Sequence, residues 1–179
     1  MEIFVSKENR QHGPFDLDQL LALLNEGQFH RRDLVYYQAL GHWHPLDEVF
    51  ELEEALQHAM DEGQEPEIIA EVYQQVAQIL GRHEHIFYIA HQKPRLLKSR
   101  PDCVVLTNER LLILRQNLGG LRLEDHLWRD VLSVSVEMAE DLLGTTFSVL
   151  DRNDHLVQIY DLPKAQLEKV CQLAQEMRN

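Results

Sequence analysis

The stretch GPFDLDQLLALLNEGQF, residues 13–29, decides how the first part of this chain folds. Its leucines recur at three- and four-residue intervals, which predicts a short amphipathic helix with Leu17, Leu20, Leu21 and Leu24 on one face. Asp16 stands where a side chain can accept hydrogen bonds from the free amides of the first turn. Gly27 stands where a glycine ends a helix, because it adopts a positive φ without a Cβ clash. We therefore expect a short helix with sharp ends and an aromatic residue beyond each of them.

Short β-prone segments and a second helix surround this stretch. The expected elements are a strand at 3–5, a polar turn at 7–11, a Gly-Pro turn at 13–14, a strand at 33–37, a loop at 42–45 and a helix at 48–61. They form an α+β unit of roughly 60 residues, a size at which an independent core is small.

The first 52 residues or so resemble the bacterial variant of the GYF domain, a small adaptor that binds proline-rich peptides. Gly13-Pro14-Phe15 matches the GPF motif of that family. Leu20 and Leu23 stand where the family has Met and Trp, and Gly27-Gln28-Phe29 stands where it has Gly-Tyr-Phe, at the same spacing. The segment LVYYQALGHWHPLDEV, residues 34–49, is similar to the second half of the variant, where a Gly-x-Trp-x-Pro element precedes a helix.

The resemblance implies a peptide-binding surface made of aromatic side chains. In eukaryotic-type GYF domains the Trp and the Tyr help to form a floor beneath the prolines of the ligand, and Leu23 and Gln28 replace them here. A polyproline segment binds aromatic surfaces well because it is preformed and loses little entropy. The side chains expected to bind the peptide are Phe15, Phe29, Tyr37, Trp43, Phe4 and His12. With two aromatics missing, we expect weak binding of about −8 to −4 kcal/mol.

The polar segment DEGQEP, residues 61–66, contains both Gly and Pro and predicts a domain boundary. A helix is expected at 67–80, and its apolar side chains fall on one face, namely Ile68, Ile69, Val72, Val76 and Ile79. That face would pack on one of the two domains or on a second copy of the chain in a homodimer. The expected organisation is a GYF-like domain at 1–60, a linker and connecting helix at 61–81 and a second domain at 82–179.

From His85 the pattern changes to short β-prone segments separated by turn residues. The expected strands are 85–90, 103–107, 110–115, 131–137, 144–150 and 155–160, with a further one near 121–127. An amphipathic helix is expected at 163–177. Six or seven antiparallel strands followed by one helix predict a curved sheet or open barrel that the helix closes.

Residues from about 82 to 179 resemble bacterial PH-like domains. The segment VVLTNERLLIL, residues 104–114, is similar to the hairpin of that family, in which a Thr-Asn turn joins two strands. The segment WRDVLSVSVE, residues 128–137, and the terminal helix are also similar. The resemblance implies a PH-like β-barrel or sandwich capped by a C-terminal helix, so the whole chain is α+β. It implies little about a ligand, because one fold serves many functions.

The charge balance limits the partners. The chain has 17 basic and 30 acidic residues, a net charge of −13, whereas binding to nucleic acid requires a basic surface. One basic run stands out, and its cations are Lys93, Arg95, Lys98 and Arg100. The resemblance to PH-like domains implies that it lies in the connection between the first two strands, where classical PH domains bind inositol phosphates. These cations suit a phosphate or an anionic lipid. The alternative that we favour is a solvated loop or a partner for an acidic surface of the same protein. Any membrane contact would be peripheral, because no apolar run approaches ~18 residues.

We expect no enzymatic activity and no cofactor, because the GxSxG, P-loop and dinucleotide-binding glycine patterns are all missing from the sequence. The pairs His42-x-His44 and His83-x-His85 have a spacing that suits a metal ion if a third ligand is nearby. Histidines that simply meet water are commoner, so no metal site is predicted. Cys103 and Cys171 are expected to be free and buried, which is typical of a cytoplasmic protein.

The sequence as a whole predicts a non-enzymatic adaptor. Its GYF-like module would recognise a partner protein, through a proline-rich or extended segment, and its PH-like domain would position that module. Three alternatives remain open. One is peripheral binding of anionic lipid through the basic loop at 93–100, and another is a structural role in an oligomer through the helix at 67–80. The third is a metal-dependent enzyme that would use the two His-x-His pairs.

Overall fold

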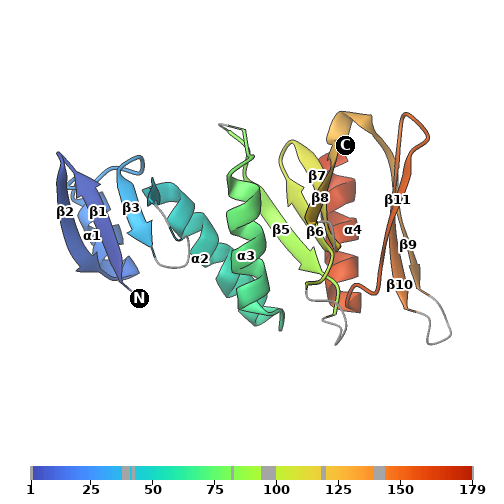
Figure 1. Ribbon diagram of the computed structural model, residues 1–179, viewed down its shortest axis with the longest axis horizontal. Coiled ribbons are helices and arrows are strands. Elements are labelled where there is room, and N and C mark those ends of the chain that lie inside the picture. The colour runs from blue at the N-terminus through green and yellow to red at the C-terminus, as the bar shows by residue number, and fades with distance from the viewer. Residues whose placement is uncertain are drawn as a thin grey trace. The chain divides into compact units, whose positions relative to one another are not determined.

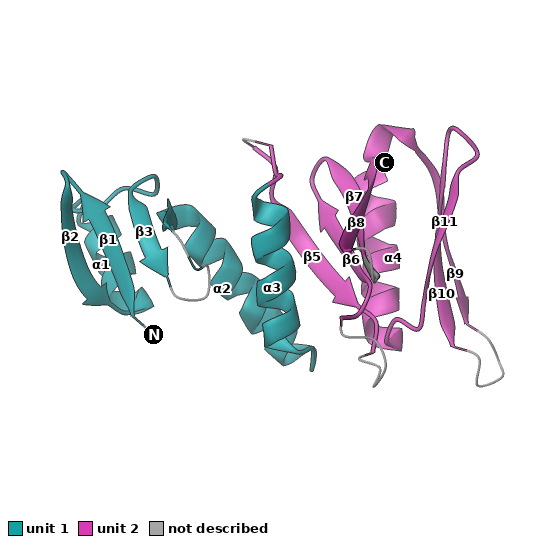
Figure 2. Cartoon of the chain, viewed as in Figure 1, with its two compact units in different colours: residues 1–78 teal, residues 79–179 magenta. Residues whose placement is uncertain are grey.

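The computed structural model divides the chain into two compact units, residues 1–78 and 79–179 (Figure 1, Figure 2). The residues that it describes are 2–37, 41, 43–81, 83–93, 100–117, 120–138 and 144–178. Strands and helices occur in both units, which confirms the α+β class. The helix expected to connect the domains lies within the first unit, and the domain boundaries given above stay a prediction.

The first unit consists of a four-stranded antiparallel sheet and three helices. Its elements are β1 (Ile3–Lys7), β2 (Arg10–Phe15), α1 (Leu17–Asn25), β3 (Leu34–Tyr37), β4 (Trp43–Pro45), α2 (Leu46–Asp61) and α3 (Pro66–Ala77). The strand order is β2-β1-β3-β4. One face of the sheet is buried through Ile3, Val5 and Val35, and α2 packs against β3 and β4. A single layer of helix therefore covers one face of this sheet.

Helix α1 forms where its end signals predict. Asp16 Oδ1 accepts a hydrogen bond from the Gln19 backbone N–H at 2.8 Å, and Gln19 Oε1 accepts one from the Asp16 N–H at 3.0 Å. This reciprocal pair is a capping box. Gly27 has a φ of 73° just beyond the helix. The apolar face is narrower than expected, because Leu20 is fully buried whereas Leu21 is exposed.

The first hairpin differs from the prediction. Lys7 pairs with Arg10, so Glu8 and Asn9 form a two-residue turn in which both residues have a positive φ. That is the geometry of a type I′ turn, whose twist suits a hairpin. The predicted turn at 7–11 is therefore too long, and Gly13-Pro14 lies inside strand β2 rather than in a turn of its own. Glutamate seldom adopts a positive φ, so the sequence lacked the usual signal for this turn.

A second difference concerns the loop expected at 42–45. Residues 43–45 form strand β4, in which His44 pairs with Val35 and Trp43 pairs with Tyr36. The segment is three residues long and ends in a proline, so the sequence pattern does not predict a strand there.

The second unit contains two antiparallel sheets and the C-terminal helix (Figure 1). Its elements are β5 (Ile86–His91), β6 (Cys103–Thr107), β7 (Arg110–Asn117), β8 (Gly120–Leu127), the 3-10 turn η1 (Trp128–Asp130), β9 (Val131–Met138), β10 (Thr145–Asp151), β11 (Leu156–Tyr160) and α4 (Lys164–Arg178). The sheet orders are β5-β6-β7-β8 and β11-β10-β9. The strand expected near 121–127 is confirmed as β8.

Helix α4 contacts strands of both sheets and completes their shared core, as expected for a capping helix. Leu167 and Val170 of the helix are fully buried with Val104 and Phe147 of the two sheets. Both cysteines are free. Cys103 is buried as predicted, whereas Cys171 is only partly buried because it lies off the core-facing side of α4.

The turn between β6 and β7 gives a structural reason for the VLTNER motif. The Thr107 hydroxyl bonds to Glu84 Oε1 at 2.8 Å and accepts hydrogen bonds from two backbone N–H groups of its own turn. The Asn108 side chain donates to the His83 carbonyl and accepts from the His85 N–H, each at 2.8 Å. These hydrogen bonds therefore hold the segment before β5 against the β6–β7 turn.

Candidate functional site

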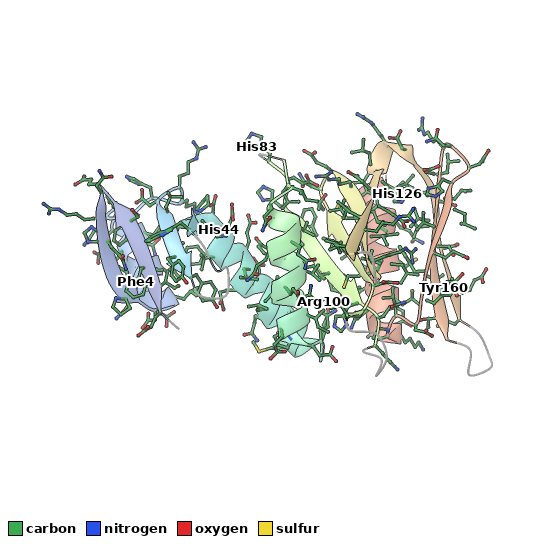
Figure 3. All side chains as sticks on the ribbon, viewed as in Figure 1. Phe4, His44, His83, Arg100, His126 and Tyr160 are labelled. Carbon is green, nitrogen blue, oxygen red and sulfur yellow. The ribbon has the colours of Figure 1, made fainter. Side chains whose placement is uncertain are left out.

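The first sheet carries a row of three aromatic side chains on the face opposite to its buried residues. Phe4 on β1 pairs with Tyr36 on β3, and Tyr36 pairs with Trp43 on β4. Residues paired across antiparallel strands point to the same side, so the three rings share one face. The Tyr36 and Trp43 ring centroids are 5.9 Å apart. Trp43 is 40% exposed, and Phe4, labelled in Figure 3, and Tyr36 are partly exposed.

We call Phe4, Tyr36 and Trp43 the aromatic row. Two further pairings extend its face, because Leu34 pairs with both Ser6 and Pro45. Leu34 is exposed, and Ser6 and Pro45 are partly exposed. None of these six side chains is charged, so the face is apolar with a few hydrogen-bonding groups. Such a surface suits an uncharged, extended ligand better than an ionic one.

Two of the predicted peptide contacts lie on the other side of the sheet. Phe29 is 6% exposed and Tyr37 is 9% exposed. The Tyr37 hydroxyl donates a hydrogen bond to Glu53 on α2. Burial, together with this bond and the nearby negative charge, raises the pKa of Tyr37 well above its ordinary value, so the hydroxyl stays protonated. Both rings therefore offer a ligand little surface.

Two other predicted contacts, Phe15 and His12, lie against Phe29. The Phe15 and His12 rings each meet Phe29 edge-on, with centroid distances of 5.7 and 5.8 Å. We call these three residues the Phe29 cluster. Lys7 Nζ lies 5.7 Å from the Phe29 ring centroid and donates to the Gln28 carbonyl. Phe15 is partly exposed and His12 is exposed, so they are the accessible members of the cluster.

The two positions at which the GYF signature has an aromatic residue and this chain has none lie beside this cluster. Gln28 is exposed and donates from Nε2 to Glu26 Oε2 at 2.8 Å. Leu23 is partly buried. The place where the family signature has two aromatics therefore holds an amide bound to a carboxylate and one aliphatic side chain.

The structure thus divides the six predicted contacts into the aromatic row, the Phe29 cluster and the buried Tyr37. Tyr36 belongs to the row and was missing from the prediction. Because side chains alternate along a strand, either Tyr36 or Tyr37 faces inward, and the strand alone does not show which. The register with β1 decides it, because Tyr37 pairs with the buried Ile3 and Tyr36 pairs with Phe4. Trp43 joins Tyr36 on its face through β4, a segment that was predicted to be a loop.

The basic run expected to hold phosphate or lipid is only partly described. Lys93 and Arg100 are exposed, and Arg95 and Lys98 lie outside the described residues. The Lys93 backbone N–H lies 3.4 Å from the Asp161 carbonyl oxygen, which fixes the start of the run. Lipid binding by this segment stays a prediction.

The two His-x-His pairs lie in different settings. His42 lies outside the described residues, whereas His44 is buried with its Nδ1 at 2.5 Å from Glu48 Oε2. His83 and His85 are exposed at the turn that Asn108 fastens. Within the part of the chain that the structure describes, neither pair belongs to a group of three metal-ligating side chains.

The helix predicted at 67–80 ends earlier, as α3 at Ala77, so Ile79 lies beyond it and is exposed, whereas most of the predicted apolar face is already buried in the single chain. Ile69, Val72 and Val76 on α3 are at most 6% exposed. The Tyr73 hydroxyl bonds to Glu51 on α2 at 3.2 Å. A dimer through this face would require these side chains to leave their present contacts, and the homodimer stays a prediction.

Comparison with known families identifies both halves. A model described as GYF domain 2 matches residues 4–52, and a model described as Bacterial PH domain matches residues 80–176, more than half of the chain. The chain therefore belongs to the bacterial PH domain family and carries a GYF domain ahead of its PH domain. Both resemblances noted in the sequence are confirmed. The two domains are binding modules rather than catalytic ones.

Other comparisons add little. Among solved structures, the chain is similar to the Vps36 N-terminal PH domain, with 14% identity and a TM-score of 0.41 over 55% of this chain and 82% of that one. A similarity at this level supports no functional argument. No curated protein matches the chain. Within the described residues, every helix is too short or too polar to cross a membrane.

Proposed function

We propose that the protein is a non-enzymatic adaptor whose GYF domain binds an extended, proline-containing segment of a partner protein on the aromatic row. The observation that carries the proposal is the alignment of Phe4, Tyr36 and Trp43 on one face of the sheet, with Trp43 exposed. The PH domain would position this module through protein contacts, because the net charge of −13 opposes an anionic membrane within a Debye length of about 8 Å.

The spacing of the row fits a polyproline helix. Such a helix has three residues per turn and rises about 3.1 Å per residue, so the prolines on one side repeat about every 9 Å. Neighbouring strands are about 4.8 Å apart, so Phe4 and Trp43, two strand spacings apart, lie roughly 10 Å apart at the backbone. A polyproline segment that crosses the strands would place successive turns on Phe4 and Trp43, with Tyr36 between them.

The row also supplies the hydrogen-bond donors that such a ligand needs. A proline-rich segment has carbonyl groups but few N–H groups, so its partners must donate. The Tyr36 hydroxyl and the Trp43 indole N–H are donors, and neither has a partner among the described residues. The Phe29 cluster is less suitable, because Lys7 lies over its central ring and Gln28 replaces the family tyrosine.

The test is a titration of the ¹⁵N-labelled full chain with a proline-rich peptide. We expect amide shifts at Phe4, Tyr36 and Trp43 and a shift of the Trp43 indole N–H. The variant Trp43→Ala should bind at least about tenfold more weakly, since a stacked aromatic contact carries about 1.4 kcal/mol or more. The matched control is Phe15→Ala, which removes an aromatic from the Phe29 cluster and should leave the affinity unchanged.

Two results would overturn the proposal. If Phe15→Ala abolishes binding and Trp43→Ala does not, the ligand binds the Phe29 cluster instead. If neither surface responds at millimolar peptide, this GYF domain does not bind proline-rich segments.

A further inference from the structure

Three side chains that can ligate a metal ion converge in the PH domain, away from both His-x-His pairs. His126 lies near the end of β8, Asp151 ends β10, and His155 lies just before β11. Their ligand atoms all lie within 4.8 Å of one another. His126, labelled in Figure 3, belongs to the four-stranded sheet, whereas the other two belong to the three-stranded sheet and its hairpin. The cluster therefore lies between the two sheets of the domain.

The distances suit a shared ion. Asp151 Oδ2 is 3.8 Å from His126 Nδ1 and 3.9 Å from His155 Nδ1. Two ligand atoms on one tetrahedral zinc ion, each about 2.1 Å from the metal, are roughly 3.4 Å apart. The observed separations are a few tenths of an ångström larger and too long for hydrogen bonds. A small rotation of the exposed His155 side chain would shorten its own separation from Asp151 Oδ2.

The hairpin between β10 and β11 holds the Asp151 carboxylate in a fixed orientation. Asp151 Oδ1 accepts hydrogen bonds from the backbone N–H groups of Asn153 and His155, at 2.8 and 3.0 Å. The backbone of Asp151 also pairs with that of His155. These bonds fix the carboxylate and hold His155 beside it, while Oδ2 faces the two imidazoles.

His126 has a buried ring with one unsatisfied nitrogen. Its side chain is 5% exposed, Nε2 has no hydrogen-bond partner among the described residues, and Nδ1 lies 3.8 Å from Asp151 Oδ2. A buried polar group without a partner is unfavourable and uncommon in folded proteins. A metal ion would bind His126 through Nδ1, the ring nitrogen that faces Asp151 Oδ2.

We propose that His126, Asp151 and His155 bind a divalent transition-metal ion of the zinc class. Two imidazoles and one carboxylate form a nitrogen-rich set that suits Zn²⁺, Co²⁺ or Ni²⁺, whereas Ca²⁺ and Mg²⁺ prefer oxygen ligands. Three protein ligands leave a fourth position for water. Because the ligands come from both sheets, the bound ion would join the sheets and stabilise the PH domain against unfolding. This proposal does not depend on peptide binding.

The test is calorimetric titration of the full chain with zinc chloride, on protein that carries no polyhistidine tag and has been treated with a chelator. We expect one zinc ion per chain and a rise in the melting temperature with zinc concentration. The variants His155→Ala and Asp151→Asn should each bind zinc more than about tenfold more weakly. His155 is exposed, so its replacement leaves the fold intact, which circular dichroism verifies. Cobalt(II) in place of zinc should give visible absorption bands that His155→Ala lacks.

The matched control is the double variant His83→Ala/His85→Ala, which removes one more imidazole than His155→Ala but none from the cluster. It should bind zinc as the wild type does. The proposal is wrong if wild-type protein binds no zinc, if both cluster variants bind as tightly as wild type, or if only the control variant loses binding.

Discussion

Glu84 and Arg110 form a two-point ion pair inside the PH domain, with Arg110 Nε 2.7 Å from Glu84 Oε1 and an Arg110 terminal nitrogen 2.9 Å from Glu84 Oε2. The Glu84 carboxylate also accepts a hydrogen bond from the Gly81 N–H at 2.9 Å, and the Thr107 hydroxyl donates to it. Arg110 extends the network to Asp125 on β8. The Glu84 side chain is almost wholly buried, so these bonds satisfy a charge that has left water.

Removing one partner from such a pair leaves the other charge buried without compensation. We expect Glu84→Ala to lower the free energy of unfolding by about 3–5 kcal/mol in urea titrations. The matched control is Asp130→Ala, which removes the partner of Arg129 from a more exposed pair and should change stability by about 1 kcal/mol or less. A loss for Glu84→Ala no larger than that of the control would show that the network contributes little.

The same carboxylate should make stability depend on pH. Burial acts to raise the pKa of Glu84, but the hydrogen bonds from Arg110, the Gly81 N–H and Thr107 outweigh it and hold the pKa below the ordinary 4.5. The unfolded chain then binds more protons than the folded one in the window below that value. The contribution of Glu84 is therefore complete above about pH 4.5 and is lost as the pH falls through the folded pKa.

The measurement is the free energy of unfolding between neutral pH and the acid limit of folding. Glu84→Gln lacks the titrating group, so its stability should fall less steeply below pH 4.5 than that of the wild type. Glu168→Gln, an exposed substitution on α4, should keep the wild-type slope. Equal slopes for all three proteins would contradict the expectation.

The local signals in the sequence predicted the elements that local interactions define. The ends of α1 follow from Asp16 and Gly27, and the β6–β7 hairpin follows from the Thr107-Asn108 turn. Strands β2 and β4 were missed, because a Glu-Asn turn and a three-residue strand ending in proline lack the usual β signals. Strands β2 and β4 form by pairing with their neighbours β1 and β3, and their own residues do not indicate that pairing.

The candidate sites depend on those missed pairings and on contacts between distant residues. The face of Tyr36 depends on the β1–β3 register, and Trp43 joins it only through β4, so the aromatic row could be predicted only in part. The two His-x-His pairs can be recognised in the sequence because their members are two residues apart. His126 and His155 are distant in the sequence and are brought together by the packing of two sheets. No regular spacing in a sequence marks a cluster of that kind.

The buried and exposed aromatics of the GYF domain should respond differently to substitution. Tyr37→Ala removes a buried ring and leaves Glu53 without its hydroxyl partner, so we expect a loss of about 3–5 kcal/mol in the free energy of unfolding. Trp43→Ala removes a ring that is 40% exposed and should cost no more than about 1 kcal/mol. Urea titration followed by circular dichroism measures both losses. Comparable losses for the two variants would place Trp43 in the core and remove it as a ligand contact.

The last prediction concerns Gly13, whose backbone position in β2 excludes a side chain. Its φ is 117°, and a Cβ atom built there would lie 2.7 Å from the Ile3 carbonyl oxygen, a backbone atom of the paired strand. Gly27 also has a positive φ, but a Cβ atom there would meet nothing within 4 Å. Gly27→Ala should therefore cost only the conformational penalty of about 1 kcal/mol.

Gly13→Ala should cost clearly more than that, about 2 kcal/mol or above, because the β1–β2 pairing must shift to make room for the methyl group. Urea titration of the two variants side by side gives the comparison. Equal losses would mean that β2 can move away from Ile3 freely.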